Sequence, residues 1–201
     1  IGALAIAQGA VWIRRPPEYA TAESPDYEWV RHALDWMAAR DIKPDILAIL
    51  RPTSPFRDGS MIRGALEFFR EAYSSISPRG RPDSLRAMRR AREHPAKVWN
   101  GHPFGSESMH PFREGSLAGP SHQLWKDAQP QHSVPTELLL PAYVQTAGLE
   151  LVWREAVERT HTISGDHVQG WLLDGPAALD INDEADWLEA ERIANMGALY
   201  D

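Results

Sequence analysis

The 201-residue chain contains no cysteine, which excludes a disulfide framework, a zinc ribbon and a thiol nucleophile. It is compatible with the cytoplasmic location that we expect. Positive charge is also scarce, because 21 Lys and Arg face 28 Asp and Glu and leave a net charge of −7. Proteins that bind DNA or RNA display dense positive charge, so we expect no nucleic-acid partner. The longest apolar run, residues 46–50, is far too short to cross a bilayer, so we expect no membrane span.

Apolar spacing predicts alternating helices and strands in one domain, residues 1–201. Two stripes at i, i+3, i+4 and i+7 predict amphipathic helices, one capped by Ser24 and one by Asp58. The stripes are Val30, Ala33, Leu34 and Met37, then Ile62, Ala65, Leu66 and Phe69. The continuous run 46–50 predicts a parallel strand, central in its sheet and covered on both faces.

The remaining regular segments continue this alternation. Strands are predicted at 85–88, 149–153 and 168–173, and a closing helix is predicted with Asn182 as its cap and Asp183 and Glu184 in its first turn. Helices that alternate with strands indicate an α/β fold. Residues 101–141 interrupt the pattern, because they hold six Pro, four Gly and four His. We expect that segment to be a working loop, an arm that packs on a partner, or disordered, and to lie outside the core.

Residues 51–57 are the first candidate site. They follow the predicted central strand and precede a helix, and α/β sheets bind ligands at the carboxyl ends of their strands. Two prolines stiffen the segment, Thr53 and Ser54 supply hydroxyls, and Arg51 and Arg57 supply guanidinium groups for phosphate or carboxylate. The alternative is a rigid turn with solvated arginines.

Asp180 and Asn182 form the second candidate site. In an extended backbone, side chains two residues apart point to the same face and place a carboxylate beside an amide oxygen. Mg²⁺ prefers oxygen ligands and often takes only one or two from protein. The alternative is that both residues only cap the helix that follows.

A basic run at residues 79–97 and a set of scattered histidines complete the candidates. Seven basic residues against two acidic ones give that run a local charge of +5, which indicates either an anion-facing wall or a solvated, salt-bridged surface. The histidines at 94, 102, 110, 122 and 132 match no compact ligand motif, so we do not expect a zinc site.

Five segments carry a family resemblance. They are Arg15-Pro16-Pro17-Glu18 ahead of Ser24-Pro25-Asp26, residues 49–57, Asp83-Ser84-Leu85 with residues 94–99, Tyr143-Val144-Gln145-Thr146, and Asp180-Ile181-Asn182 ahead of Asp186-Trp187. In this order, across nearly the whole chain, they resemble the acylneuraminate cytidylyltransferase family, the CMP-sialic acid synthetases and related enzymes.

The resemblance implies a Rossmann-like, three-layer nucleotidyltransferase fold with a mostly parallel central sheet. It also implies that CMP is transferred from CTP to the anomeric hydroxyl of an acidic sugar, with release of pyrophosphate. Mg²⁺ would be the cofactor, and the protein would be a homodimer in which the 101–141 extension reaches the partner or the active site. Phosphoryl-type transfer of this kind depends mainly on positioning and charge neutralisation.

The resemblance assigns the roles residue by residue. Asp180 and Asn182 would hold the metal, and Asp180 and Arg51 would be the catalytic residues. Arg15 would lie near the nucleotide. The substrate-binding set would be completed by Thr53, Ser54, Arg57, Asp83, Ser84, Lys97 and Gln145.

The chain departs from the family pattern at several positions. The family's glycine-rich CTP loop has no counterpart, so we expect the domain to be N-terminally incomplete; if Ile1 is the true start, nucleotide binding should be impaired. Arg51 stands where Gln is usual, Ala22 where Asp is expected, and Asn182 at the second metal position. Thr146-Ala147 replaces the usual Asn-Gly. Two alternatives stay open: an impaired homologue that acts as a binding or assembly partner, and a nucleotidyltransferase for another nucleotide or sugar.

Overall fold

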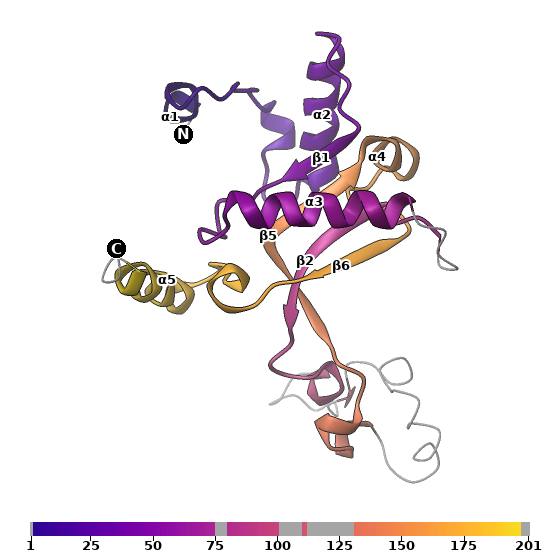
Figure 1. The fold of residues 1–201 in the computed structure, drawn as a ribbon, viewed down its shortest axis with the longest axis vertical. Helices are drawn as coiled ribbons and strands as arrows, with labels where there is room; N and C mark the ends of the chain where they lie inside the picture. Colours follow the sequence, from indigo (N-terminus) through magenta and orange to yellow (C-terminus); the bar gives the residue numbers. More distant parts are fainter. Residues whose placement is uncertain (1, 75–79, 101–109, 112–130, 198–201) are drawn as a thin grey trace.

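A four-stranded sheet forms the centre of the computed structural model, which describes residues 2–74, 80–100, 110–111 and 131–197 (Figure 1). The strand order is β1–β5–β2–β6. The strands are β1 (Ile46–Ile49), β2 (Ser84–Arg90), β5 (Tyr143–Trp153) and β6 (Val168–Leu172). The predicted α/β class is confirmed. The expected mostly parallel pairing is not found in this sheet, because β5 is antiparallel to both β1 and β2 and only β2 and β6 pair in parallel.

The position of the first strand was predicted wrongly. In the described sheet β1 lies at an edge and pairs only with β5. The central place goes to β5, in which residues 146–152 are buried without interruption. An apolar run of strand length therefore indicated a strand correctly but not its place in the sheet.

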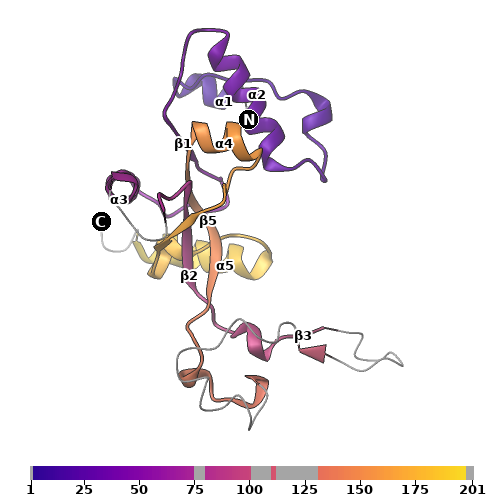
Figure 2. The same ribbon diagram turned by 90° about the vertical axis from the view of Figure 1, so that its right-hand side faces the viewer.

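Helices cover both faces of the sheet and give it three layers. On one face, α2 (Asp26–Ala38) and α4 (Arg154–Thr160) enclose a core with Val30, Ile49, Val152 and Val157. On the other face lies α3 (Gly59–Ser74) (Figure 2). Its Phe69 is buried in a core that includes Leu85, Leu149 and Leu151. Alternation along β5 sends neighbouring residues into opposite cores, as the pleat of a strand requires.

The two striped helices form as predicted, and one of the two caps is confirmed. Asp58 caps α3, because its Oδ1 accepts a hydrogen bond from the Met61 N–H at 2.8 Å. The cap of α2 is Pro25 and not Ser24. The Ser24 hydroxyl instead donates to the Glu18 carbonyl and accepts from the Thr21 N–H, so it closes the preceding turn.

The remaining α-helices and strands of the described residues are α1 (Gly2–Ala7), α5 (Glu184–Gly197) and the antiparallel pair β3 (Trp99–Asn100) and β4 (His110–Pro111). Residues 101–109 and 112–130 of the proposed extension lie outside the described residues. We expected the whole 101–141 segment to lie outside the core. In its described C-terminal part, however, Val134 and Leu139 are buried and form a small hydrophobic cluster with Ala96. Over the ranges described here, no helix combines the length and the apolar character that a membrane crossing needs.

Candidate functional site

The two predicted site segments meet at one end of the sheet. The Ile181 N–H donates a hydrogen bond of 2.9 Å to the Thr53 carbonyl, which joins residues 180–182 directly to the loop after β1. A cavity of about 320 Å³, here called the loop cleft, lies at this junction. Its lining consists of Asp26, Arg51, Thr53, Gln145, Thr146, Ala147, Asp180 and Asn182.

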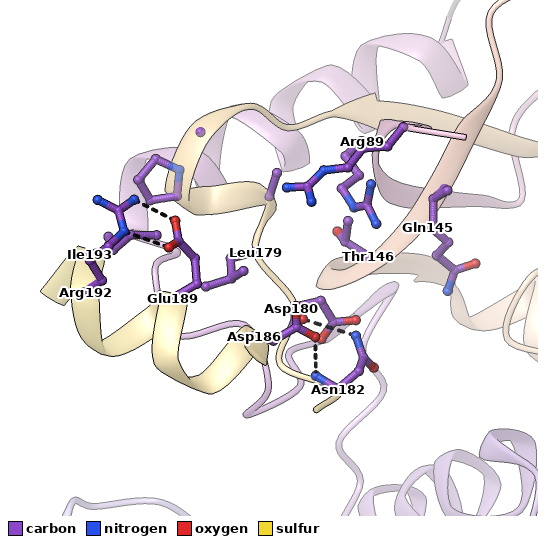
Figure 3. Close-up of a pocket in the computed structure, with 15 residues that line it drawn as sticks. Arg89, Gln145, Thr146, Leu179, Asp180, Asn182, Asp186, Glu189, Arg192 and Ile193 are labelled. Carbon is purple, nitrogen blue, oxygen red and sulfur yellow. Dashed lines mark hydrogen bonds and ion pairs between the residues drawn. The ribbon is translucent and has the colours of Figure 1, made fainter. Parts of the chain in front are cut away.

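A second cavity of about 450 Å³, here called the arginine cavity, adjoins the loop cleft (Figure 3). The two cavities share Gln145, Thr146, Asp180 and Asn182. Arg89 and Arg92 contribute positive charge to the arginine cavity, and α5 contributes Asp186, Glu189 and Arg192. Both volumes fall in or near the usual range for small-molecule sites, about 300–1,000 Å³.

An irregularity in β5 shapes the shared wall. Opposite β2, the register passes from Arg86 with Glu150 to Met88 with Gln145, so several residues of β5 face the single residue Ala87. Such bulges re-aim side chains and are frequent beside active sites. Residues 145–147, which line the loop cleft, lie at this irregularity.

Asp180 presents an oxygen that the protein leaves unsatisfied. Its Oδ1 is buried and accepts no hydrogen bond from the described residues. A buried polar atom without a partner costs free energy unless a ligand satisfies it. The Asn182 side chain donates from Nδ2 to the Asp180 main-chain carbonyl at 3.1 Å, which leaves its amide oxygen as the group that can face a ligand.

Asn182 does not cap the closing helix. Asp183 does so, because its Oδ1 accepts a hydrogen bond of 2.9 Å from the Asp186 N–H. The Asp186 carboxylate accepts a hydrogen bond of 2.9 Å from the Asn182 N–H. The acidic residues in the first turn of α5 are Glu184, as predicted, and Asp186. The capping role that competed with the metal role therefore falls to Asp183, and the Asn182 side chain is not used as a cap.

The oxygen donors fit a divalent cation that completes its shell elsewhere. Asp180 offers a carboxylate oxygen and Asn182 an amide oxygen, both of the type that Mg²⁺ prefers. Within the described ranges no set of three or more His, Cys, Asp or Glu side chains is placed to hold a metal. Substrate phosphates and water would have to supply the remaining ligands.

Arg51 lines the loop cleft but belongs to an ion-pair network, in which its own side chain and that of Asp26 are partly exposed. Its Nη2 and Nη1 donate to the Asp26 carboxylate at 2.5 and 3.3 Å, and its Nε donates to Glu150 Oε1 at 2.9 Å. Glu150 also pairs with Arg86, its cross-strand neighbour on β2. The Glu150 and Arg86 side chains are only 1% and 4% exposed. The guanidinium of Arg51 is therefore not the free fork that we expected for a sugar, because all three of its nitrogens donate within the protein.

Charge pairing and burial shift the pKa values in this network. The hydrogen bond from Arg51 lowers the pKa of Asp26 below its ordinary value of 3.8. Burial lowers the pKa of the Arg86 guanidinium below its ordinary value. Arg57 is also lowered in pKa by burial, and its Nη1 donates to the Gly148 carbonyl at 3.3 Å. Arg57 thus supports the irregular part of β5 and does not line either cavity.

Three of the predicted substrate-binding residues have partners away from both cavities. Asp83 accepts hydrogen bonds from Arg159 and from the N–H groups of Asp166 and His167. Ser84 is buried at the start of β2, the opposite end of that strand from Arg89, and donates to the Ser164 carbonyl. Lys97 donates to the carbonyls of His132 and Val134 at 2.6 and 2.7 Å. These side chains hold turns and segments in place.

Arg15 and Ser54 lie near the site without lining either cavity. The Arg15 guanidinium is 5.3 Å from the ring centre of Trp29, and Trp29 donates from its indole to Asp26 at 2.9 Å. Arg15 is thus linked to the wall of the loop cleft by a cation–π contact. Ser54 is buried, and its hydroxyl has no partner among the described residues.

The predicted site set did not include several residues that line the cavities, among them Arg89, Arg92, Thr146 and Asp186. Arg89 and Arg92 belong to the basic run at residues 79–97, but the composition of the run does not indicate which of its arginines line a cavity. The position of these two at the carboxyl end of a strand was the available signal.

Comparison with known proteins gives one partial match. No family model matches the chain. The chain is 36% identical over 77 residues to the N-acylneuraminate cytidylyltransferase of Escherichia coli O18:K1:H7 (strain RS218 / NMEC). The match covers 37% of this chain and 17% of that protein's length. This similarity supports a nucleotidyltransferase relationship at a coarse level.

Proposed function

We propose that this chain is part of a cytidylyltransferase that transfers CMP from CTP to the anomeric hydroxyl of an acidic sugar, with a Rossmann-like domain as its scaffold. The observation that best supports the proposal is the junction of residues 180–182 with the loop after β1, where the unsatisfied Asp180 oxygen lies in the same cleft as Thr53 and Gln145. The partial similarity to an N-acylneuraminate cytidylyltransferase points in the same direction.

The reaction is a displacement at phosphorus. The anomeric oxygen forms a bond to the α-phosphorus of CTP, the bond from that phosphorus to the bridging oxygen breaks, and pyrophosphate leaves. The hydroxyl proton passes to solvent or to a nearby carboxylate. Such a step needs aligned reactants and compensation of the charge on the phosphates more than covalent help.

The chain's own residues have distinct parts in this proposal. Asp180 and Asn182 would hold Mg²⁺, which when bound supplies positive charge to the phosphates. Gln145 and Thr53 offer an amide and a hydroxyl to the sugar at the wall of the loop cleft. Arg51 is a positioning residue, because its bonds to Asp26 and Glu150 fix the loop after β1 relative to α2 and β5. The same proposal includes a homodimer.

A pyrophosphate-release assay tests the function. The natural full-length protein is incubated with Mg²⁺, each of the four ribonucleoside triphosphates, and a panel of nine-carbon and eight-carbon acidic sugars. We expect release with CTP and with at least one sugar of the panel. Release with another triphosphate would favour a different nucleotidyltransferase. Silence across the whole panel would favour a binding or assembly role instead.

A further inference from the structure

His94 is a buried histidine to which the proposed function gives no part. The residue is only 5% exposed. It follows β2 along the chain and begins the short helical turn Pro95–Lys97, which leads toward the 101–141 extension. A buried polar ring needs hydrogen-bond partners at both nitrogens, because each unpaired group would cost free energy. The partners of His94 therefore show what the ring holds together.

The two partners of the ring fix its tautomer. The Ala96 N–H donates to Nδ1 at 3.1 Å, so Nδ1 carries no proton. The other nitrogen, Nε2, lies 2.8 Å from the Leu140 carbonyl. A carbonyl oxygen can only accept, so Nε2 carries the ring proton and donates it. His94 is therefore a neutral imidazole that connects the turn after β2 with the segment that leads into β5.

Further contacts join the same two segments. The Ala91 N–H donates to the Ala142 carbonyl at 2.9 Å, one step beyond the paired ends of β2 and β5. Lys97 donates to two carbonyls of the second segment, and a small hydrophobic cluster contains residues of both. Residues 91–97 and 132–142, here called the extension base, thus form a folded unit beyond the ends of β2 and β5 (Figure 2).

The extension base is continuous with the lining of the arginine cavity. Arg92 lines this cavity and belongs to the same turn of chain as His94. On the other segment, Gln145 lines the cavity and follows closely after Leu140. The last pairs of a two-stranded ribbon open most easily unless further contacts hold them. Opening of the extension base would therefore release the bond from Ala91 and move Arg92 relative to Gln145.

We propose that His94 is a positioning residue whose Nε2–H bond to the Leu140 carbonyl closes the extension base and so fixes Arg92 relative to Gln145 in the lining of the arginine cavity. The contact at Nδ1 has a separate part, because it shapes only the turn that His94 itself begins. This positioning does not depend on which reaction the cavity serves. Its consequence for turnover rests on the proposed function.

Two substitutions separate the two ring nitrogens. His94→Gln keeps an N–H group at the reach of Nε2 but removes the acceptor for the Ala96 N–H. His94→Asn keeps that acceptor, but its side chain is too short to donate to the Leu140 carbonyl. His32→Asn is the matched control, because it also removes a bond between a ring Nε2 and a carbonyl, here that of Arg14 at 3.1 Å, and His32 lines neither cavity.

Nitrogen NMR of the full-length protein at neutral pH tests the inference. In the wild type, the ¹⁵N shifts of the His94 ring report which nitrogen carries the proton. In each variant, hydrogen exchange is measured at the amides of Ala91 and Ala96, and the side-chain amide of Gln145 reports on the cavity. Circular dichroism checks that each variant keeps the fold.

We expect the wild-type proton at Nε2. His94→Asn should speed exchange of the Ala91 amide at least about tenfold, leave the Ala96 amide protected, and shift the Gln145 side-chain resonance. His94→Gln should do the reverse, with faster exchange at Ala96, less than about threefold change at Ala91 and no shift at Gln145. His32→Asn should change none of these three signals.

Several results would overturn the inference. They are a wild-type ring proton at Nδ1, loss of Ala91 protection in His94→Gln, equal Ala91 exchange in both His94 variants, or a Gln145 resonance that does not respond to His94→Asn. The Gln variant alone decides the case if His94→Asn does not fold. Because no readout needs turnover, silence in the pyrophosphate-release assay bears on the proposed function alone. Where release is observed, His94→Asn should raise KM more than His94→Gln does.

Discussion

Glu150→Gln is the sharpest test of the ion-pair network that supports the loop cleft, because Glu150 and Arg86 are its buried members. The substitution keeps the shape of the side chain but removes the carboxylate that pairs with both Arg51 and Arg86. Because Glu150 is 1% exposed and the Arg86 side chain 4% exposed, the unpaired guanidinium stays away from water. Breaking a buried pair in this way costs about 3–5 kcal/mol. For a domain of this size that corresponds to a fall in Tm of roughly 6–20 °C.

The assay is urea unfolding followed by circular dichroism, with Glu158→Gln as the control. Glu158 pairs with Arg154 on the same helix, but both side chains are partly exposed, at 43% and 35%. An exposed i, i+4 pair contributes under about 1 kcal/mol. Equal losses of unfolding free energy in the two variants would refute the argument that burial makes the Glu150 network costly to break.

Three further predictions follow from particular contacts. Because the pKa of Asp26 is lowered in the folded state, its ionised form stabilises the fold above about pH 4, and this contribution is lost as the pH falls further. Asp26→Asn should therefore reduce the change of the urea midpoint with pH between about pH 3 and 6. An unchanged pH dependence of the midpoint would contradict the assignment. Gly165→Ala should lower the free energy of unfolding by about 2 kcal/mol or more, since φ is +68° and the new Cβ would overlap Asp83. Gly175→Ala, with φ +58° and open space around the new Cβ, should lower it by about 1–2 kcal/mol. Equal shifts in Tm for the two variants would contradict a steric contribution at Gly165. Asn182→Asp should tighten Mg²⁺ binding measured by calorimetry, because it adds a negative charge to the ligand set, and weaker binding would argue against Asn182 as a ligand.

Local pattern was enough to predict most of the regular elements. The two apolar stripes gave α2 and α3, and the continuous apolar run gave β1. These features depend on neighbours along the chain, which periodicity reads directly. The general rule that ligand sites form at the carboxyl ends of strands also pointed to the loop after β1, which lines the loop cleft through Arg51 and Thr53.

Non-local pairing explains what the sequence did not reveal. Nothing in the spacing of Asp26, Arg51, Arg86 and Glu150 shows that four segments bring these charges into one ion-pair network. The insertion of β5 between β1 and β2 is equally invisible, because a strand's partner and direction are set by the whole sheet.

Asp83 and Lys97 illustrate a related difficulty. Each carries a charge that suits a ligand, yet each forms its hydrogen bonds within the protein. Asp83 accepts from Arg159 and from two backbone N–H groups, and Lys97 donates to two carbonyls. Only the folded arrangement distinguishes a charge that holds a turn from a charge that faces a cavity.

We propose that Asp180, at the junction of the loop cleft with the arginine cavity, anchors a metal-dependent nucleotide site. A calorimetric titration of the full-length protein with CTP tests this role, with and without Mg²⁺, for the wild type and for Asp180→Asn. We predict CTP binding that requires Mg²⁺ in the wild type and is weakened at least about hundredfold in the variant. Binding that is equally strong in both proteins, or that ignores Mg²⁺, would contradict the account.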